Sequence, residues 1–162
     1  MQDHEVAGLL AGEVGKLLLE IRDRAMAEGW SPNRLRDEGD GQAHQLLVDR
    51  LAGLRPHDAV LSEEGADDGH RVHAERVWIV DPLDGTHDFG RPGSIEWAVH
   101  IALVVDGSPS AAAVCLPASR RLYGTAMTTA QHPTERVRPV VITSRSQQGE
   151  AEEVAAAIGG VV

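Results

Sequence analysis

The segment that most restricts the fold is VWIVDPLDGTHDF, residues 77–89, which sets two aspartates around a proline at the end of an apolar run. The apolar run is typical of a buried strand. Pro82 has a fixed φ angle and no amide hydrogen, so it cannot continue a sheet, and we expect the chain to turn there. The turn would direct Asp81 and Asp84 toward one point, with the Leu83 carbonyl between them.

The residues after this turn, Gly85, Thr86 and His87, can open a helix whose first amides face an anion. An anion seat beside two aspartates is typical of a phosphoryl-transfer site, where metal ions lower the pKa of a bound water. Asp-Pro and Asp-Gly are also common in plain turns, so the segment alone leaves a loop as the alternative.

The rest of the chain predicts two helices followed by strands. Apolar residues recur at helical spacing over residues 6–25, with Asp3 as the N-cap and Gly29 as the stop. We expect a loop over Trp30–Gly39 and a second helix over residues 41–54. Strands are expected over 58–64, 76–81, 96–105, 110–117 and 121–127, with a hairpin turn at 106–109. A helix pair followed by an antiparallel meander indicates an α+β fold.

We expect two domains, an α+β metal-binding domain at residues 1–133 and the start of a C-terminal α/β domain at residues 134–162. Residues 128–139 are polar, contain two prolines and are typical of a linker. A strand and a helix follow, with Ser144 or Ser146 as the helix cap. One strand and one helix cannot bury both of their faces, so we expect the remainder of this domain to be missing.

Five carboxylates stand out because the expected strands would gather them: Asp40, Glu63, Glu64, Asp81 and Asp84. If the two strands that end at these acidic residues are neighbours, their carboxylates converge at one edge of the sheet. Like charges so close raise each other's pKa or need a cation between them. Hard oxygen ligands without a cysteine or histidine cluster favour Mg²⁺ over Zn²⁺. A solvated acidic edge is the alternative for the glutamate pair taken alone.

Charge and cysteine content narrow the class of partner. The formal net charge of −10 disfavours nucleic acids and anionic membranes and leaves small phosphorylated molecules. Cys115 is the only cysteine, so we expect no disulfide and a reducing, cytoplasmic location. The apolar stretch over residues 6–21 is interrupted by Glu13 and Lys16, and is neither a signal-peptide core nor a membrane span.

With these residues in view, the chain resembles the inositol monophosphatase superfamily of Mg²⁺-dependent, lithium-sensitive phosphatases. WIVDPLDGTHDF is similar to the family signature W-x-I/V-D-P-I/L-D-G-T, LSEEG to its glutamate motif and GDGQAHQLLVDRL to its aspartate-helix motif. The resemblance covers nearly the whole chain. It implies the N-terminal part of a layered α/β/α/β/α sugar-phosphatase fold and a phosphoric monoester hydrolase.

The resemblance also implies ligands for two or three Mg²⁺ ions. Glu63, Asp81 and the Leu83 carbonyl would bind the first ion, and Asp81 and Asp84 the second. Glu63 would hold a third ion through water. Glu64 would lie behind these ligands without touching the metal.

The catalytic and phosphate-binding roles follow from the same resemblance. Thr86, hydrogen-bonded to Asp40, would help to activate the attacking water, which makes Asp40, Glu63 and Thr86 the expected catalytic residues. The amides of Gly85 and Thr86 would bind the phosphate. His87 would contact the phosphate when protonated, and the alternative is an exposed residue in the first turn of a helix.

Within the superfamily, the chain resembles the 3′-phosphoadenosine-5′-phosphate phosphatases, or 3′(2′),5′-bisphosphate nucleotidases, of bacterial sulfate assimilation more than it resembles the inositol enzymes. DGTHDF is similar to their D-G-T-K/R-E-F, whereas inositol enzymes usually read D-G-T-x-N-F; His87 and Asp88 depart from the basic residue and the glutamate. The resemblance implies hydrolysis of 3′-phosphoadenosine-5′-phosphate to AMP, with inositol-1-phosphate or a sugar phosphate as the alternative. Arg145 would meet the second phosphate of the nucleotide, and a solvated arginine is the alternative.

One family element is missing from the sequence. Family members carry a later W-D-x-A-A/G-P motif, whose aspartate completes the second metal site. The tryptophans here, Trp30, Trp78 and Trp97, do not precede aspartate. We therefore expect a truncated chain, with a non-catalytic remnant that binds metal or phosphate as the alternative of another class. A homodimer is also consistent with the sequence, since an incomplete second layer leaves an apolar face that could pair with a second copy.

Overall fold

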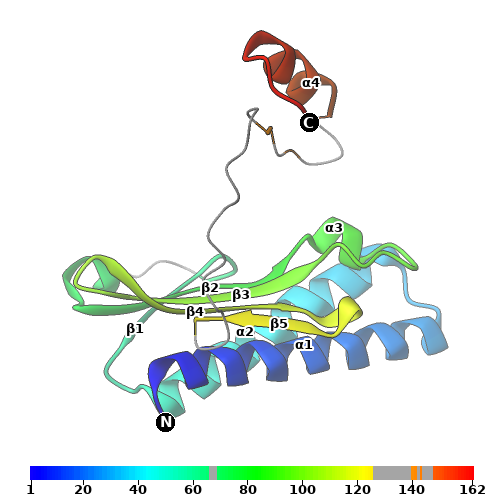
Figure 1. The fold of residues 1–162 in the computed structure, drawn as a ribbon. Coiled ribbons are helices and arrows are strands. Elements are labelled where there is room, and N and C mark those ends of the chain that lie inside the picture. The colour runs from blue at the N-terminus through cyan, green and yellow to red at the C-terminus, as the bar shows by residue number, and fades with distance from the viewer. Residues whose placement is uncertain (66–68, 126–139, 142, 144–147) are drawn as a thin grey trace. The chain divides into compact units, whose positions relative to one another are not determined.

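The computed structural model describes residues 1–65, 69–125, 140, 141, 143 and 148–162 of the chain. The chain is divided into two compact units, Met1–Thr128 and Thr129–Val162. The first unit consists mainly of two long helices and a five-stranded sheet, and Figure 1 shows both helices on the same face of that sheet. The fold is α+β, as the sequence predicts.

Helix α1 (Asp3–Glu28) ends where the sequence predicts and begins one residue earlier than predicted. Gly29 ends it in the left-handed conformation, with φ at 66°, as predicted. The N-cap, however, is Gln2 rather than Asp3. Asp3 instead lies in the first turn, where a negative charge is favourable at the positive end of the helix dipole.

Helix α2 (Pro32–Leu54) begins about nine residues before the predicted second helix, so the predicted loop over Trp30–Gly39 is confirmed at Trp30 and Ser31 and wrong from Pro32 onward. Ser31 is the N-cap, and its hydroxyl accepts a 3.3 Å hydrogen bond from the amide of Arg34. Pro32 occupies the first helical position, where a missing amide hydrogen costs nothing because that amide would have no partner. The proline therefore starts this helix and does not interrupt it.

The sheet has the strand order β1-β2-β3-β4-β5. Its strands are β1 (Ala59–Ser62), β2 (Arg76–Asp84), β3 (Ala98–Val105), β4 (Ser108–Leu116) and β5 (Arg121–Gly124). The pairs from β2 to β5 are antiparallel, which confirms the predicted meander, whereas β1 pairs with β2 in parallel. Short helical turns lie at η1 (His70–His73), α3 (Thr86–Phe89) and η2 (Pro117–Ser119).

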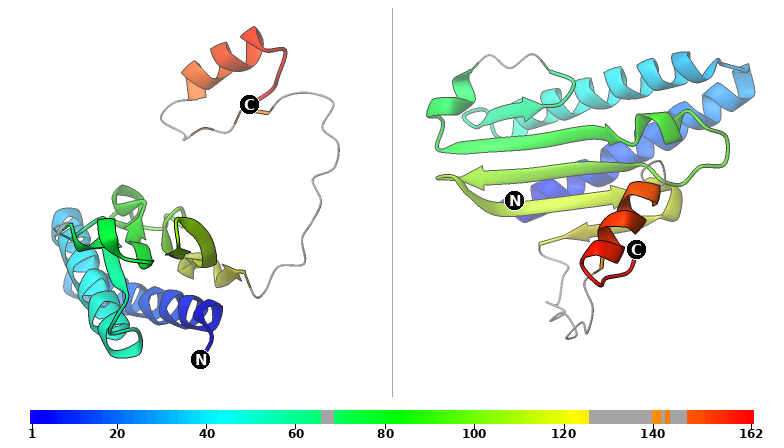
Figure 2. Two further views of the ribbon diagram at one scale, coloured as in Figure 1. Left: turned by 90° about the vertical axis from the view of Figure 1, so that its left-hand side faces the viewer. Right: turned by 90° about the horizontal axis from the view of Figure 1, so that it is seen from above.

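The core of the first unit lies between the helix pair and the sheet. Helix α1 packs on β3, β4 and β5, and α2 packs on β2; Figure 2 shows the same one-sided arrangement in two further views. The largest fully buried side chains include Trp78, Trp97 and Phe89, and the rings of Phe89 and Trp97 meet edge to face at 5.0 Å. Trp97, Val99, Ile101 and Leu103 are buried, as the alternation in the sequence predicts.

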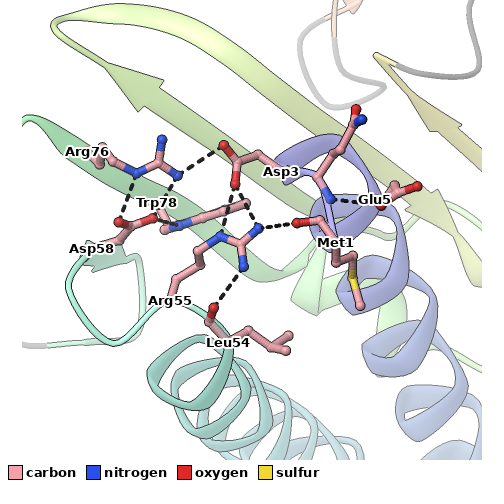
Figure 3. A network of polar contacts seen from close by, with 9 residues as sticks. Met1, Asp3, Glu5, Leu54, Arg55, Asp58, Arg76 and Trp78 are labelled. Atoms are coloured by element: carbon pink, nitrogen blue, oxygen red, sulfur yellow. Dashed lines mark hydrogen bonds and ion pairs between the residues drawn. The ribbon is translucent and has the colours of Figure 1, made fainter.

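A network of ion pairs ties both helices to the sheet where β1 and β2 begin (Figure 3). Asp58 accepts two hydrogen bonds from Arg76, at 2.9 and 3.0 Å, and one from the indole nitrogen of Trp78 at 2.9 Å. Arg76 and Arg55 both donate to the carboxylate of Asp3. The hydrogen bond to Asp58 is the main cause that raises the pKa of Arg76. The guanidinium therefore stays charged.

The second unit is described in part. It contains helix α4 (Gln148–Ala157), whose Ala151 and Ala155 are buried, and a single β-bridge between Val140 and Val161. The predicted linker, the two candidate capping serines and Arg145 lie wholly or largely outside the described residues. Within the described part of the chain, no helix is both long and apolar enough to cross a membrane.

Candidate metal and phosphate site

The parallel pairing of β1 and β2 brings two of the predicted ligands side by side. Ser62 and Val80 are register partners at the end of β1, and the amide of Glu63 donates a 3.2 Å hydrogen bond to the Val80 carbonyl. The next residue on each strand is therefore acidic, Glu63 on one and Asp81 on the other. The convergence that the sequence predicts for these two residues is confirmed in the backbone.

The electrostatics of Asp81 reflect this proximity. Burial raises its pKa to about 7, with a further rise from the hydrogen bond and the charge of the neighbouring Glu63 carboxyl and from Asp84. The amide of Leu83 donates a 3.1 Å hydrogen bond to Asp81 Oδ1, which works in the opposite direction. Two carboxylates held this close repel each other, and a bound cation would relieve the repulsion.

The strand does not turn at Pro82 but continues to Asp84 through an irregularity. Asp81 is opposite His100 and Asp84 is opposite Ala98, so the register shifts between the two aspartates. A bulge of this kind accommodates a proline, which has no amide hydrogen to give to a ladder. The consequence is close to the prediction, because both aspartates remain at one end of β2.

The Leu83 carbonyl and Asp40 share one donor, the hydroxyl of Thr86. Thr86 Oγ1 lies 2.9 Å from the Leu83 oxygen and 3.4 Å from Asp40 Oδ1. Burial raises the pKa of Asp40 to about 6, and the charge of Glu64 adds to the rise. Helix α2 thus brings Asp40 to the residues that follow β2, as the family resemblance implies.

Gly85 forms the sharp turn between β2 and α3. Its φ is 80°, and a Cβ there would lie 2.6 Å from the carbonyl oxygen of Glu96. Only glycine fits a position that is both left-handed and so crowded by backbone. Thr86 then begins α3, and His87 on that helix is exposed.

Two features of the site were missed by sequence reasoning. His100 on β3 lies 3.3 Å from Asp84 through its Nε2, so it contacts one of the predicted metal ligands. His44 on α2 is hydrogen-bonded to Ser62, immediately before Glu63. His44 lies four residues after Asp40, on the same helix face. His100 is opposite Asp81 in the register of β2 and β3. The two histidines can be assigned to the site only once the pairing of the strands is known.

A hollow of about 490 Å³ opens beside the acidic residues on the sheet face away from α1 and α2. Glu63, Asp81 and His100 line it together with apolar side chains of β1 to β4. This volume falls within the range of small-molecule sites, and a few polar groups in an apolar wall are typical of them.

The chemistry of the donors fits Mg²⁺ better than a softer metal. The carboxylates of Glu63, Asp81 and Asp84 and the Leu83 carbonyl are all hard oxygen donors. Among the residues that the structure describes, no three His, Cys, Asp or Glu side chains form a ready cage for a metal ion. The site therefore offers suitable atoms, with the side chains of Asp84 and His100 paired to each other.

The fold and the acidic edge together define a protein with the inositol monophosphatase fold. A structure of inositol monophosphatase II from Staphylococcus aureus MSSA476 superposes with a TM-score of 0.78 at 21% identity, covering 98% of this chain and 63% of that one. Residues 3–156 match the inositol monophosphatase family, and the chain belongs to this family.

Two curated relatives are a phosphatase and a nucleotidase, and both are longer than this chain. Over 133 residues, 76% of the chain, it is 48% identical to the 3′-phosphoadenosine 5′-phosphate phosphatase of Mycobacterium leprae (strain TN). It is 34% identical over 121 residues to the 3′(2′),5′-bisphosphate nucleotidase CysQ of Escherichia coli O157:H7. These matches cover 48% and 49% of the relatives, so the chain spans about half of their length.

Proposed function

We propose that this chain carries the metal-binding part of a Mg²⁺-dependent phosphatase for a small phosphomonoester. The observation that carries the proposal is the adjacency of Glu63 and Asp81 at the ends of parallel strands, with burial and mutual repulsion raising the pKa of Asp81 to about 7. A purely structural acidic edge would lie exposed and unstrained, whereas here the carboxylate is half-buried among like charges. A cation-binding role accounts for that arrangement.

In the proposed site, Glu63, Asp81, Asp84 and the Leu83 carbonyl hold Mg²⁺, as two or three ions. Bound Mg²⁺ supplies charge that lowers the pKa of a water and stabilises the phosphate oxygens. The chain's own ligands keep the ions at the edge of the sheet, next to the hollow where a substrate would lie. The position of the ligands at strand ends, rather than on loops alone, keeps them in a fixed geometry.

Thr86 and Asp40 orient the attacking water in this proposal. The Thr86 hydroxyl has one proton, for which the Leu83 carbonyl at 2.9 Å and Asp40 at 3.4 Å are the acceptors, and its lone pairs can accept a hydrogen bond from a water. Asp40 takes up, through Thr86, one proton of the water and returns it to solvent after the reaction. The oxygen of the water bonds to phosphorus, the bond from phosphorus to the ester oxygen breaks, and the leaving oxygen takes a proton from solvent water.

Phosphate binding falls to the turn after β2. The amides of Gly85 and Thr86 belong to the first turn of α3, where backbone donors lack partners within the helix. The positive φ of Gly85 aims that turn away from the strand. His87, exposed on α3, would add a positive charge to the phosphate seat when protonated.

The substrate we favour is 3′-phosphoadenosine-5′-phosphate, whose 3′-phosphate would be released to leave AMP. The support is the 48% identity to a phosphatase named for this nucleotide. An inositol-1-monophosphatase of Mycobacterium leprae (strain TN), 40% identical over 101 residues, keeps inositol-1-phosphate as the second candidate. That match covers 59% of this chain, less than the 76% of the first.

The test is phosphate release by the purified chain from each of the two compounds, with and without Mg²⁺. We expect release from the bisphosphate nucleotide to need Mg²⁺, to be inhibited by lithium and to be lost in Asp81→Asn. Equal or faster release from inositol-1-phosphate would overturn the choice of substrate. Mg²⁺ binding without release from either compound would assign the chain the metal-binding role alone.

A further inference from the structure

A histidine and a serine beside the acidic cluster have no role in the function proposed above. His44 Nδ1 and Ser62 Oγ are 2.8 Å apart in a hydrogen bond between α2 and the end of β1. Ser62 is buried, with 7% of its surface exposed. A hydroxyl this deep needs a partner, because an unpaired buried polar group is costly.

The chain wraps closely around the His44 ring after it leaves β1. The amide of Gly65 donates a 3.2 Å hydrogen bond to the Ser62 carbonyl, which closes a tight turn that contains Glu63. A Cβ at Gly65 would lie 3.1 Å from His44 Cε1 and 3.4 Å from Ser62 Cβ. The imidazole therefore contacts both ends of the turn, Ser62 and Gly65. A larger side chain at Gly65 would collide with the ring.

Helix α2 contacts the ends of both strands that lead to the predicted metal ligands, through two residues one turn apart. Asp40 and His44 are four residues apart and so lie on the same face of the helix. Asp40 accepts from Thr86, which follows β2, while His44 is bonded to Ser62, which ends β1. One face of α2 thus holds both the end of β1 and the residues that follow β2, where the predicted metal ligands lie.

The last paired residues of β1 and β2 are Ser62 and Val80, so the sheet ladder stops immediately before Glu63. Beyond this point the position of the Glu63 carboxylate depends on its own amide bond to Val80 and on the turn around His44. Glu63 is exposed, and the contact of its carboxyl with that of Asp81 is the one by which it reaches the second ligand.

We infer that His44 is a positioning residue for the metal site, which acts through Ser62 to hold Glu63 beside Asp81. The inference rests on the proposed function, in which Glu63 and Asp81 share a metal ion. His44 itself touches neither metal nor substrate in this account. Groups that orient metal ligands in this indirect way commonly change metal affinity by 10- to 100-fold when they are removed.

The experiment compares Mg²⁺ dissociation constants of the full chain by calorimetry at one pH near 7.5. His44→Ala and Ser62→Ala each break the hydrogen bond from one side, and Ser62→Ala removes a single oxygen atom. His44→Asn keeps a polar amide near the position of Nδ1 and serves as the conservative variant. His57→Ala is the matched control, because His57 is exposed and lines the same surface pocket as His44 without contacting Ser62.

We expect Mg²⁺ binding weakened about ten-fold or more in His44→Ala and Ser62→Ala, substantial rescue in His44→Asn and wild-type affinity in His57→Ala. Thermal unfolding with EDTA shows which variants remain folded, and Ser62→Ala provides the answer if His44→Ala does not fold. Wild-type affinity in folded Ser62→Ala, or equal loss in His57→Ala, overturns the inference. Absence of Mg²⁺ binding in the wild-type chain overturns the proposed function and the inference with it, and is seen before any variant is compared.

Discussion

The amide of Glu63 donates a 3.2 Å hydrogen bond to the carbonyl of Val80, the residue that precedes Asp81. This bond lies at the last parallel pair of β1 and β2, Ser62 with Val80, and sets the two acidic residues that follow next to each other. Neighbouring carboxylates in a half-buried setting weaken the metal-free fold. The structure therefore couples stability to the occupancy of the site.

Asp81→Asn should stabilise the metal-free chain while abolishing Mg²⁺ binding. Burial and Glu63 raise the pKa of Asp81 to about 7, so its ionised form is disfavoured in the folded state at pH 8. A neutral amide avoids this penalty, and we expect a gain of about 1 kcal/mol after solvent screening, or roughly 2–4 °C in Tm. Thermal unfolding at pH 8 with EDTA measures it; a lower Tm for the variant would contradict the account.

The metal-free chain should be more stable at pH 5 than at pH 8. The pKa values of Asp40 and Asp81, about 6 and about 7, lie above the ordinary value of 3.8, so the folded state binds more protons than the unfolded state between these limits. Stability then falls as the pH rises through this window. Urea midpoints with EDTA at pH 5, 6, 7 and 8 test this. Asp81→Asn should flatten the profile, and a midpoint that rises toward pH 8 in the wild type would refute it.

Added Mg²⁺ should stabilise the chain more at pH 8 than at pH 5. Carboxylates bind metal in the deprotonated form, so protons compete with Mg²⁺ for Asp81. The increase in Tm on adding Mg²⁺ to EDTA-treated chain, measured at each pH, gives the comparison. An increase that is the same at both pH values, or that persists in Asp81→Asn, would show that the ion binds elsewhere.

Two glycines of α2 should respond to alanine in opposite directions. A Cβ at Gly39 would lie 2.6 Å from Phe89 Cε1 and 3.1 Å from Leu83 Cδ2, whereas one at Gly41 meets nothing within 4 Å. Gly39→Ala should destabilise the fold by about 1–3 kcal/mol through overpacking beside the site. Gly41→Ala should stabilise it by roughly 0.5–1 kcal/mol. Urea unfolding of both variants decides, and equal effects would contradict the packing described here.

Asp58→Ala should be among the more damaging substitutions outside the site. The side chain of Asp58 is 7% exposed and is the shared acceptor of Arg76 and Trp78, so its loss removes the acceptor of the Trp78 indole and leaves Arg76 with Asp3 as its carboxylate partner. We expect a loss of about 1–3 kcal/mol. Lys16→Ala is the control, because its pair with Glu20 is 3.7 Å long and highly exposed, and should change stability by less than about 1 kcal/mol. Similar losses in the two variants would argue against the network in Figure 3.

Much of the fold follows from local patterns in the sequence. The apolar spacing of α1, the left-handed stop at Gly29 and the alternation of buried residues along β3 each have a local physical cause. The start of α2 is not predicted because a charged stretch that contains Pro32 is typical of a loop, although a serine followed by proline is also the signature of a helix start. Here the position of the proline in the helix decides its effect.

The site could be predicted only as far as its motifs reach. The neighbouring positions of Glu63 and Asp81 required one assumption, that their strands pair, and the structure confirms it. The contacts of His44 with Ser62 and of His100 with Asp84 depend on the register and on which helix face meets the sheet. Neither can be read from a single sequence, because each joins residues on different elements through tertiary packing.

The central claim, that the Glu63 and Asp81 edge binds Mg²⁺, is tested most directly by titrating the metal-free chain with Mg²⁺ in a calorimeter at pH 7.5. The account predicts saturable binding in the wild type that is lost in Asp81→Asn, although the variant is folded and no less stable. Identical binding isotherms for the wild type and Asp81→Asn would contradict it.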